Sequence, residues 1–278
     1  MNKLQLLIVC AFFSSPMFGQ REILYKQIDT VKLYLEIHSP VRMDKETQKP
    51  ANVFFFGGGW QNGDRSHFAE QADYFSKRGL VCILADYRTE SKHQTTPYVA
   101  LQDAKSAMRY VRQNASKLGV DPNKIVASGG SAGGHLAAAT SLIADYNDKN
   151  DDLSIDCKPN ALLLFNPVID NGPGGYGYER IGDNYKNFSP LHNIKRGAPP
   201  TLFLIGTEDR YIPVETAEYY QTVMEKVGSR CELRIYEGEK HGFFNYRFID
   251  MFKETIHEAD IFLQSLGYLN EEPKVEIN

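Results

Sequence analysis

One serine in this sequence lies in a context that suits nucleophilic chemistry. Ser131 sits within the stretch IVASGGSAGGHL, which contains the pattern Gly-x-Ser-x-Gly. A serine hydroxyl is a weak nucleophile at neutral pH and needs an adjacent base to activate it. Because the pattern also arises by chance in flexible turns, the rest of the chain must show whether a base and an acid are available.

Two further side chains can complete such a site. His241, in the stretch EKHGF, can take the proton of a serine and return it to a leaving group. Asp209, in the stretch GTEDRYIP, can hold the imidazole in one tautomer and stabilise the imidazolium that forms. Together, Ser131, Asp209 and His241 predict acyl-transfer chemistry.

The elements that must position these residues alternate along the chain. Val53–Phe56, Val81–Leu84 and Leu162–Phe165 are apolar throughout, as strands covered by helices on both sides require. The patterns predict a strand pair in 23–37, strands at 52–56, 80–85, 124–127, 161–165, 201–205 and 231–236, a turn at 121–122, and helices at 67–78, 98–118, 132–144, 214–227 and 248–266. The sequence therefore predicts one α/β domain, residues 20–278, with a central mostly parallel sheet flanked by helices.

Each candidate residue follows a predicted strand. Ser131 follows the strand at 124–127, Asp209 the strand at 201–205 and His241 the strand at 231–236. Sites in parallel sheets form at the carboxyl ends of the strands, so we expect the three side chains at one edge. The order Ser, Asp, His is that of the α/β-hydrolase arrangement.

Backbone donors for a developing oxyanion are also present. Three glycines follow the strand at 52–56, and the amides of Gly58 and Gly59 are candidate donors. The amide of Ala132, directly after the candidate nucleophile, is the third.

Four stretches, GGSAGG, FGGGW, GTEDRYIP and KHGFF, resemble secreted serine esterases of the α/β-hydrolase superfamily. The closest groups are the hormone-sensitive-lipase-like carboxylesterases and the bacterial acetylxylan and feruloyl esterases. The resemblance covers residues 53–244 and implies Ser131 as nucleophile, Asp209 as acid and His241 as base. The chain departs from the family at Phe56, where a histidine usually begins the glycine loop. Phenylalanine can pack there but cannot form a hydrogen bond.

Other side chains in the sequence could take the acid role of Asp209 or the base role of His241. We prefer Asp209 to Glu208 because Asp209 lies four residues before Pro213, in the family's Asp-x-x-aliphatic-Pro pattern. Six other histidines compete with His241, but only His241 follows a late strand. His135 lies one turn into the helix after Ser131, where we expect it to pack or cap.

Aromatic side chains are the candidates for substrate binding. Trp60, beside the glycine loop, is interpreted either as a core residue or as a pocket wall. Segment 170–193 interrupts the alternation with glycines and with tyrosines that include Tyr176 and Tyr178. It is interpreted as a short lid insertion, with a plain surface loop as the alternative. Tyrosines there can stack on sugars or aromatic acyl groups.

Composition excludes several classes of partner. The net charge is −4 without a long basic run, which argues against nucleic acid. The pattern Gly172-x-Gly174-x-x-Gly177 contains Pro173 and precedes no periodic helix, so it predicts no dinucleotide site. No histidines or cysteines have the spacing of a metal site. We expect no cofactor and no metal.

The first 19 residues read as a signal peptide, with Lys3 before an apolar run at 4–13 and small residues at 14–19. The run is too short to span a membrane, so we expect a secreted or periplasmic protein without stable membrane insertion. Cys82, Cys157 and Cys231 are expected as buried thiols, although pairing of Cys157 with Cys231 stays open, as does the oligomeric state.

The resulting hypothesis is a secreted serine carboxylesterase. It would hydrolyse short acyl esters such as acetyl, or feruloyl esters, on a small molecule or an oligosaccharide, with plant or algal polysaccharide as a suggested source. A serine peptidase with the same triad and a non-catalytic binding protein that retains the fold are the alternatives.

Overall fold

The computed structural model describes residues 21–40 and 47–277. The expected signal peptide, residues 1–19, lies outside the described residues. Within the described residues, eight strands form one sheet in the order β1-β2-β4-β3-β5-β6-β7-β8. The strands are β1 Arg21–Ile28, β2 Val31–His38, β3 Lys49–Phe55, β4 Val81–Ala85, β5 Val120–Gly130, β6 Ala161–Phe165, β7 Thr201–Gly206 and β8 Cys231–Tyr236.

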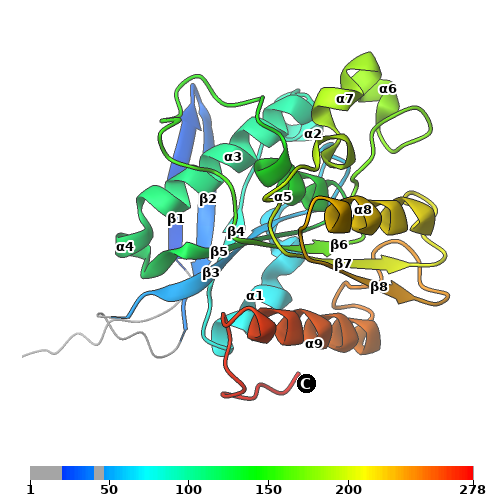
Figure 1. Ribbon diagram of the computed structural model, residues 1–278. Helices are drawn as coiled ribbons and strands as arrows, with labels where there is room; N and C mark the ends of the chain where they lie inside the picture. Colours follow the sequence, from blue (N-terminus) through cyan, green and yellow to red (C-terminus); the bar gives the residue numbers. More distant parts are fainter. Residues whose placement is uncertain (1–20, 41–46, 278) are drawn as a thin grey trace, which may run out of the picture.

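The sheet is mostly parallel, as the sequence predicted. β1 pairs with β2 and β2 pairs with β4 in antiparallel fashion, and every later pair is parallel. The antiparallel strands lie at one side of the sheet and are turned well away from the direction of β7 and β8 (Figure 1). The carboxyl ends of β3, β5, β6, β7 and β8 therefore meet along one edge.

Helices cover both faces of the sheet (Figure 1). On one face, α3, α4, α5 and α8 contribute Met108, Leu118, Leu136 and Tyr220 to one apolar cluster. On the other, α1 and α9 contribute Phe75, Ile256 and other residues to a second cluster. The helices are α1 Ala69–Lys77, α2 Glu90–His93, α3 Pro97–Gln113, α4 Ala115–Leu118, α5 Ala132–Leu142, α6 Tyr178–Ile181, α7 Tyr185–Phe188, α8 Val214–Lys226 and α9 Ile249–Ser265, with 3₁₀ turns η1 Arg65–Phe68, η2 Gly182–Asn184 and η3 Pro190–Asn193.

One expected element is divided and another is wrong. The helix expected at 98–118 is present as α3 and α4, which are separated by Asn114, whose φ of −102° and ψ of 17° depart from helical values. Its amide and its side chain both donate to the carbonyl of Tyr110, at 3.0 and 2.9 Å. The turn expected at 121–122 lies inside β5, which begins at Val120. There the register between β3 and β5 shifts, and Asp121 accepts a hydrogen bond from the amide of Asn123 at 2.9 Å.

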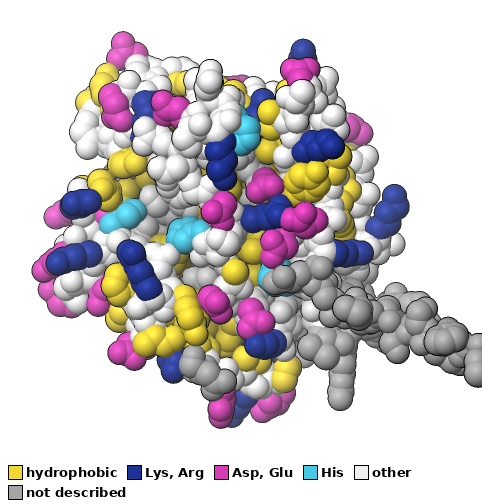
Figure 2. Space-filling model, turned by 180° about the vertical axis from the view of Figure 1, so that it is seen from behind, with side chains coloured by type: hydrophobic (Ala, Val, Ile, Leu, Met, Phe, Trp, Pro, Cys, Tyr) yellow, Lys and Arg dark blue, Asp and Glu magenta, His cyan; other side chains and the backbone are white. Residues whose placement is uncertain are grey.

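The surface shows no concentration of one charge on the face turned away from Figure 1. Lys, Arg, Asp and Glu side chains are interspersed across it (Figure 2). Within 21–40 and 47–277, no helix is long and apolar enough to cross a membrane. Cys82, Cys157 and Cys231 are buried free thiols, so Cys157 and Cys231 are not paired in this structure.

The turn between β5 and α5 depends on close contact between backbones. A Cβ atom added to Gly133 would lie 2.0 Å from the carbonyl oxygen of Phe55 in β3. One added to Gly129 would lie 2.3 Å from the carbonyl carbon of Gly133. Because backbone cannot move aside as a flexible side chain can, only glycine fits at both positions.

This contact gives a stability prediction. Gly133→Ala forces α5 away from β3, and we expect a loss of about 4 kcal/mol or more in the free energy of unfolding, measured by urea titration. Ser141→Ala in the same helix is the control, because the Ser141 hydroxyl is buried without a hydrogen-bond partner and its removal costs little. A Gly133→Ala protein as stable as the control would contradict the argument.

Candidate active site

Ser131 lies on a strained turn at the end of β5. Its φ of 53° and ψ of −121° are rarely adopted by residues other than glycine. Its amide donates to the carbonyl of Phe165 at 3.1 Å, and its carbonyl accepts from the amides of His135 and Val168 at 3.1 and 3.0 Å. These three bonds hold the strained conformation and leave the hydroxyl directed into a cleft.

His241 and Asp209 continue from that hydroxyl in a hydrogen-bonded chain. Ser131 Oγ lies 2.9 Å from His241 Nε2, and His241 Nδ1 lies 2.7 Å from Asp209 Oδ2. The carboxylate is fully buried, and its second oxygen accepts from the amides of Tyr211 and Ile212 at 2.9 and 3.1 Å. Since a carboxylate only accepts, Nδ1 carries the proton and Nε2 is free to accept from the serine.

Rival side chains for these roles lie elsewhere. Glu208 is exposed and its closest cationic partner is Lys240, at 3.8 Å. His135 is buried beside Trp60 and Phe188, with Nε2 3.0 Å from the carbonyl oxygen of Phe188, so it packs as expected. Burial lowers the pKa of His135 to about 3.

A residue that the sequence analysis missed stands at the end of β6. Asn166 is buried, with φ of 36°, and its Oδ1 accepts from the amide of Gly242 at 2.9 Å. Its Nδ2 lies 3.4 Å from His241 Nε2. Asn166 thus ties the loop that carries His241 to the centre of the sheet. Its position directly after an apolar strand was the one signal that marked it.

The glycine loop brings its amides to the same cleft. Gly57, Gly58 and Gly59 line it beside Ser131, and Ala132, buried, supplies the first amide of α5, which has no acceptor within the helix. Within the part of the chain that the structure describes, the amides of Gly58 and Gly59 donate to no other group. All three amides are therefore available to an oxyanion.

Phe56 is accommodated by packing. Its ring stacks on Tyr87 with centroids 3.9 Å apart and planes inclined by 13°. The hydroxyl of Tyr87 donates to the carbonyl of Phe56 at 2.8 Å. One side-chain hydrogen bond to the loop comes from His67, which accepts from the amide of Gly57 at 3.0 Å and which the sequence analysis did not single out.

The cleft has a volume of about 360 Å³ and is lined by few aromatic side chains. Tyr176 lines it, as expected, and packs edge-on against Tyr211, which packs edge-on against His241. Trp60 is 1% exposed and does not line the cleft, so it is the core aromatic and not the pocket wall. Tyr178 does not line it either, because its hydroxyl is directed to Asp183 at 2.9 Å, outside the cleft.

Segment 170–193 is folded into the short elements α6, η2, α7 and η3, of which α6 and α7 lie above α8 at the upper right of Figure 1. Arg180 of this segment donates to the carbonyl of Gly59, and its guanidinium lies over the rings of Trp60 and Tyr176, 5.3 and 5.5 Å from their centroids. The segment therefore contacts the glycine loop directly and supplies Tyr176 to the cleft.

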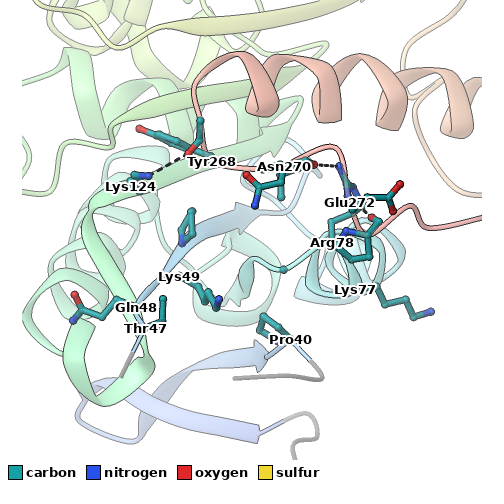
Figure 3. Close-up of a pocket in the computed structure, with 15 residues that line it drawn as sticks. Pro40, Thr47, Gln48, Lys49, Lys77, Arg78, Lys124, Tyr268, Asn270 and Glu272 are labelled. Carbon is teal, nitrogen blue, oxygen red and sulfur yellow. Dashed lines mark hydrogen bonds between the residues drawn. The ribbon is translucent and has the colours of Figure 1, made fainter. Parts of the chain in front are cut away.

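A larger cavity of about 650 Å³ lies at the opposite edge of the sheet (Figure 3). It lies where β3 and β4 begin and is lined by Lys49, Arg78, Lys124 and Tyr268, among others. Arg78 is already paired with Asp260 and donates to the carbonyl of Asn270 at 2.8 Å. None of the candidate catalytic groups lines this cavity. Among the described residues, no group of three or more His, Cys, Asp or Glu side chains could hold a metal ion.

Comparison with known proteins identifies the class. Residues 35–172 match the BD-FAE family, and residues 171–267 match the prolyl oligopeptidase family. The structure of Thermogutta terrifontis esterase 2 phosphorylated by paraoxon is similar, with 43% identity and a TM-score of 0.87 over 94% of this chain and 99% of that chain. The chain therefore belongs to the α/β-hydrolase superfamily of serine esterases, of the hormone-sensitive-lipase-like type.

Individual relatives are esterases as well. An acetylxylan esterase of Xylanibacter ruminicola is 28% identical over 204 residues, 67% of this chain and 39% of that protein. Esterase LipC of Mycobacterium tuberculosis is 30% identical over 226 residues, 73% of this chain and 55% of that protein. The chain thus spans about two fifths to just over half of these curated relatives. The propionate-bound form of the Thermogutta esterase is 43% identical with a TM-score of 0.86, over 94% of this chain and 98% of that chain.

The geometry around Asp209 gives a prediction for its amide variant. In Asp209→Asn the side-chain oxygen still accepts hydrogen bonds from the amides of Tyr211 and Ile212. The NH₂ group therefore faces His241 Nδ1 and donates to it, which forces the imidazole proton to Nε2. Nε2 can then no longer accept from Ser131, and we expect kcat for p-nitrophenyl acetate to fall by about 10⁴-fold. Glu208→Gln, one residue away and exposed, should retain the activity. Equal losses in the two variants would rule out the assignment of Asp209.

Burial of His135 predicts a pH-dependent stability. The unfolded chain binds a proton at His135 below about pH 6.5, whereas the folded protein stays neutral there until about pH 3. The free energy of unfolding therefore falls by about 1.4 kcal/mol per pH unit across that window as the pH is lowered. Between about pH 6.5 and pH 4.5, wild type should lose roughly 2–3 kcal/mol more than His135→Gln in urea titrations. Parallel pH dependences in the two proteins would contradict this.

Proposed function

We propose that this protein is a carboxylesterase that hydrolyses short-chain acyl esters through an acyl-serine intermediate. The observation that carries the proposal is the continuous chain from Ser131 Oγ through His241 to Asp209, with both hydrogen bonds at 2.9 Å or less. It opens into the same cleft as the free amides of the glycine loop.

Acylation follows from this geometry. Ser131 Oγ attacks the ester carbonyl while His241 Nε2 takes the hydroxyl proton. The negative charge that develops on the carbonyl oxygen is stabilised by the amides of Gly58, Gly59 and Ala132, which donate to no other described group before the substrate binds. Asp209 stabilises the imidazolium, and its hydrogen bonds from the amides of Tyr211 and Ile212 hold the carboxylate in place.

Deacylation uses the same groups in reverse. The imidazolium first gives its proton to the alkoxy oxygen of the tetrahedral intermediate, and the alcohol leaves, which forms the acyl-serine. A water molecule then gives a proton to His241 Nε2 and attacks the acyl carbonyl. Collapse of the second tetrahedral intermediate releases the carboxylic acid, and the proton returns to Ser131.

The size of the cleft supports a small acyl group. A volume of about 360 Å³ is near the lower end of ligand pockets in general. Propionate and butyrate are the ligands in two structures of the Thermogutta esterase. Acetyl groups on a polysaccharide are one source of such esters, supported by the similarity to an acetylxylan esterase. Tyr176 and Tyr211 line the cleft and can contact a sugar or a feruloyl group.

Export is part of the same proposal. The order of a positive charge, an apolar run and small residues in 1–19 supports a signal peptide, and a polysaccharide substrate is met outside the cytoplasm.

A peptidase is the second candidate, because residues 171–267 match the prolyl oligopeptidase family. Hydrolysis rates on matched p-nitrophenyl esters and peptide p-nitroanilides separate the two. A peptidase cleaves both substrates, whereas an esterase cleaves the esters without measurable cleavage of the anilides, since an amide nitrogen is a much poorer leaving group and must be protonated.

Removing the candidate nucleophile tests the reaction itself. Ser131→Ala should lower kcat for p-nitrophenyl acetate by about 10⁵–10⁶-fold and abolish labelling by a fluorophosphonate probe. The control variant Ser141→Ala, in the helix that follows Ser131, should retain both the kcat and the labelling by the probe. A loss of only a few-fold in Ser131→Ala would sink the assignment, and a folded wild type that the probe does not label would favour a non-catalytic binding protein.

The substrate class needs a separate measurement. Acetate and ferulate release should be compared on acetylated xylan, feruloylated arabinoxylan and free aryl acetates. Release of acetate from the polymer supports the polysaccharide proposal. Reaction with the aryl esters alone contradicts the polysaccharide proposal but leaves the esterase assignment intact.

A further inference from the structure

Two side chains outside the candidate triad connect the glycine loop to the loop that carries His241. His67, in η1, accepts a hydrogen bond from the amide of Gly57 at its Nδ1, 3.0 Å away. Its Nε2 lies 2.7 Å from Oδ1 of Asn245, a residue 178 positions further along the chain. The Nδ2 of Asn245 donates to the carbonyl of Gly242 at 2.6 Å.

The direction of every bond in this connection is fixed. A backbone amide can only donate, so Nδ1 of His67 must be the unprotonated nitrogen. Nε2 therefore carries the proton and donates to Asn245 Oδ1, and the amide group of Asn245 is left to donate to Gly242. The hydrogen bonds that connect Gly57 to Gly242 can all form only in this tautomer of His67 and in one orientation of the Asn245 side chain.

The two ends of the connection, Gly57 and Gly242, lie next to the groups that take part in the reaction. Gly57 precedes the candidate oxyanion donors, and a Cβ atom placed on it would lie 3.5 Å from Cβ of Ser131. Gly242 directly follows His241. His67 and Asn245 both line the cleft, and the His67 ring lies 4.8 and 5.6 Å from the rings of Phe68 and Phe244. The pair is thus held between the donors and the base.

We propose that His67 and Asn245 are positioning residues that set the distance between the oxyanion donors and His241. They provide, from outside the glycine loop, the side-chain hydrogen bond that Phe56 cannot make. This inference rests on the proposed function, because it assigns the pair a part in the same reaction. A displacement of about 1 Å between reacting groups can cost about 10²-fold in rate, so a connection of this kind acts on kcat.

Burial of His67 favours the neutral form that the connection requires. Burial lowers the pKa of His67, while the hydrogen bond to Asn245 and the charge of Asp64 oppose that effect. Arg247 and His241 add to the lowering. Protonation would place a hydrogen on Nδ1 facing the amide of Gly57, so the neutral form is the one that holds the loop.

Variants can separate the two bonds. His67→Phe keeps a ring but removes both bonds, and we expect kcat for p-nitrophenyl acetate to fall about 10- to 100-fold with KM changed by less than about 3-fold. In His67→Asn the side-chain oxygen lies near the position of Nδ1, so the bond to Gly57 is retained and much of the rate should return. Asn245→Leu breaks the connection at its other end without altering η1.

A double-mutant cycle distinguishes a connection from two separate effects. If the pair acts as one unit, His67→Phe combined with Asn245→Leu should lower kcat no more than about 3-fold beyond the worse single variant. The control is His38→Phe at the opposite edge of the sheet, where His38 is buried and bonds to Glu36 at 2.8 Å. It should reduce thermal stability without reducing kcat.

The rate of fluorophosphonate labelling is the second readout, because the phosphonyl oxygen uses the same donors. The inference is overturned if wild type is active and folded His67→Phe stays within about 2-fold of it in kcat, or if the two substitutions multiply independently. A wild type that neither hydrolyses esters nor is labelled overturns the proposed function first, which distinguishes the two failures.

Discussion

The close approach of α5 to β3 is the constraint on which the site depends. Gly133 lies against the carbonyl of Phe55, so the chain must turn within one residue between the end of β5 and the start of α5. That residue is Ser131, and its positive φ is held by bonds to β6 and to the segment after it. The same turn puts the first free amide of α5 beside the hydroxyl. The candidate nucleophile and one candidate oxyanion donor are therefore parts of one turn, which is produced by backbone packing rather than by side-chain contacts.

Around this turn, Asp209 and His241 are each held by neighbours that are themselves hydrogen-bonded. Asp209 is buried with both oxygens bonded, which offsets the cost of removing a carboxylate from water. Asn166 bonds the His241 loop from the centre of the sheet, whereas Asn245 bonds it from the side of the glycine loop. The imidazole is thus held from two directions, and little reorganisation is needed when charge develops during the reaction.

The sheet, its order of elements and the positions of Ser131, Asp209 and His241 were predictable, because apolar strands and the residues that follow them are local patterns. The substrate-binding residues were less so. The sequence left Trp60 open between a core residue and a pocket wall, and it offered Tyr176 as a substrate-binding residue. Only Tyr176 reaches the cleft, and the direction of its side chain depends on how segment 170–193 folds. His67 carried no sequence signal at all, because its role arises from contact with a loop far along the chain.

The contact of Arg180 with the carbonyl of Gly59 has a consequence for how such an enzyme can change over evolutionary time. Segment 170–193 holds the glycine loop through this arginine and shapes the cleft through Tyr176. A lineage that exchanges the segment to accept another acyl group also alters the support of the loop beside the nucleophile. A change in substrate selectivity is therefore coupled to the rate of catalysis. An exchanged segment that preserves activity must keep a cationic side chain that donates to the carbonyl of Gly59, as Arg180 does.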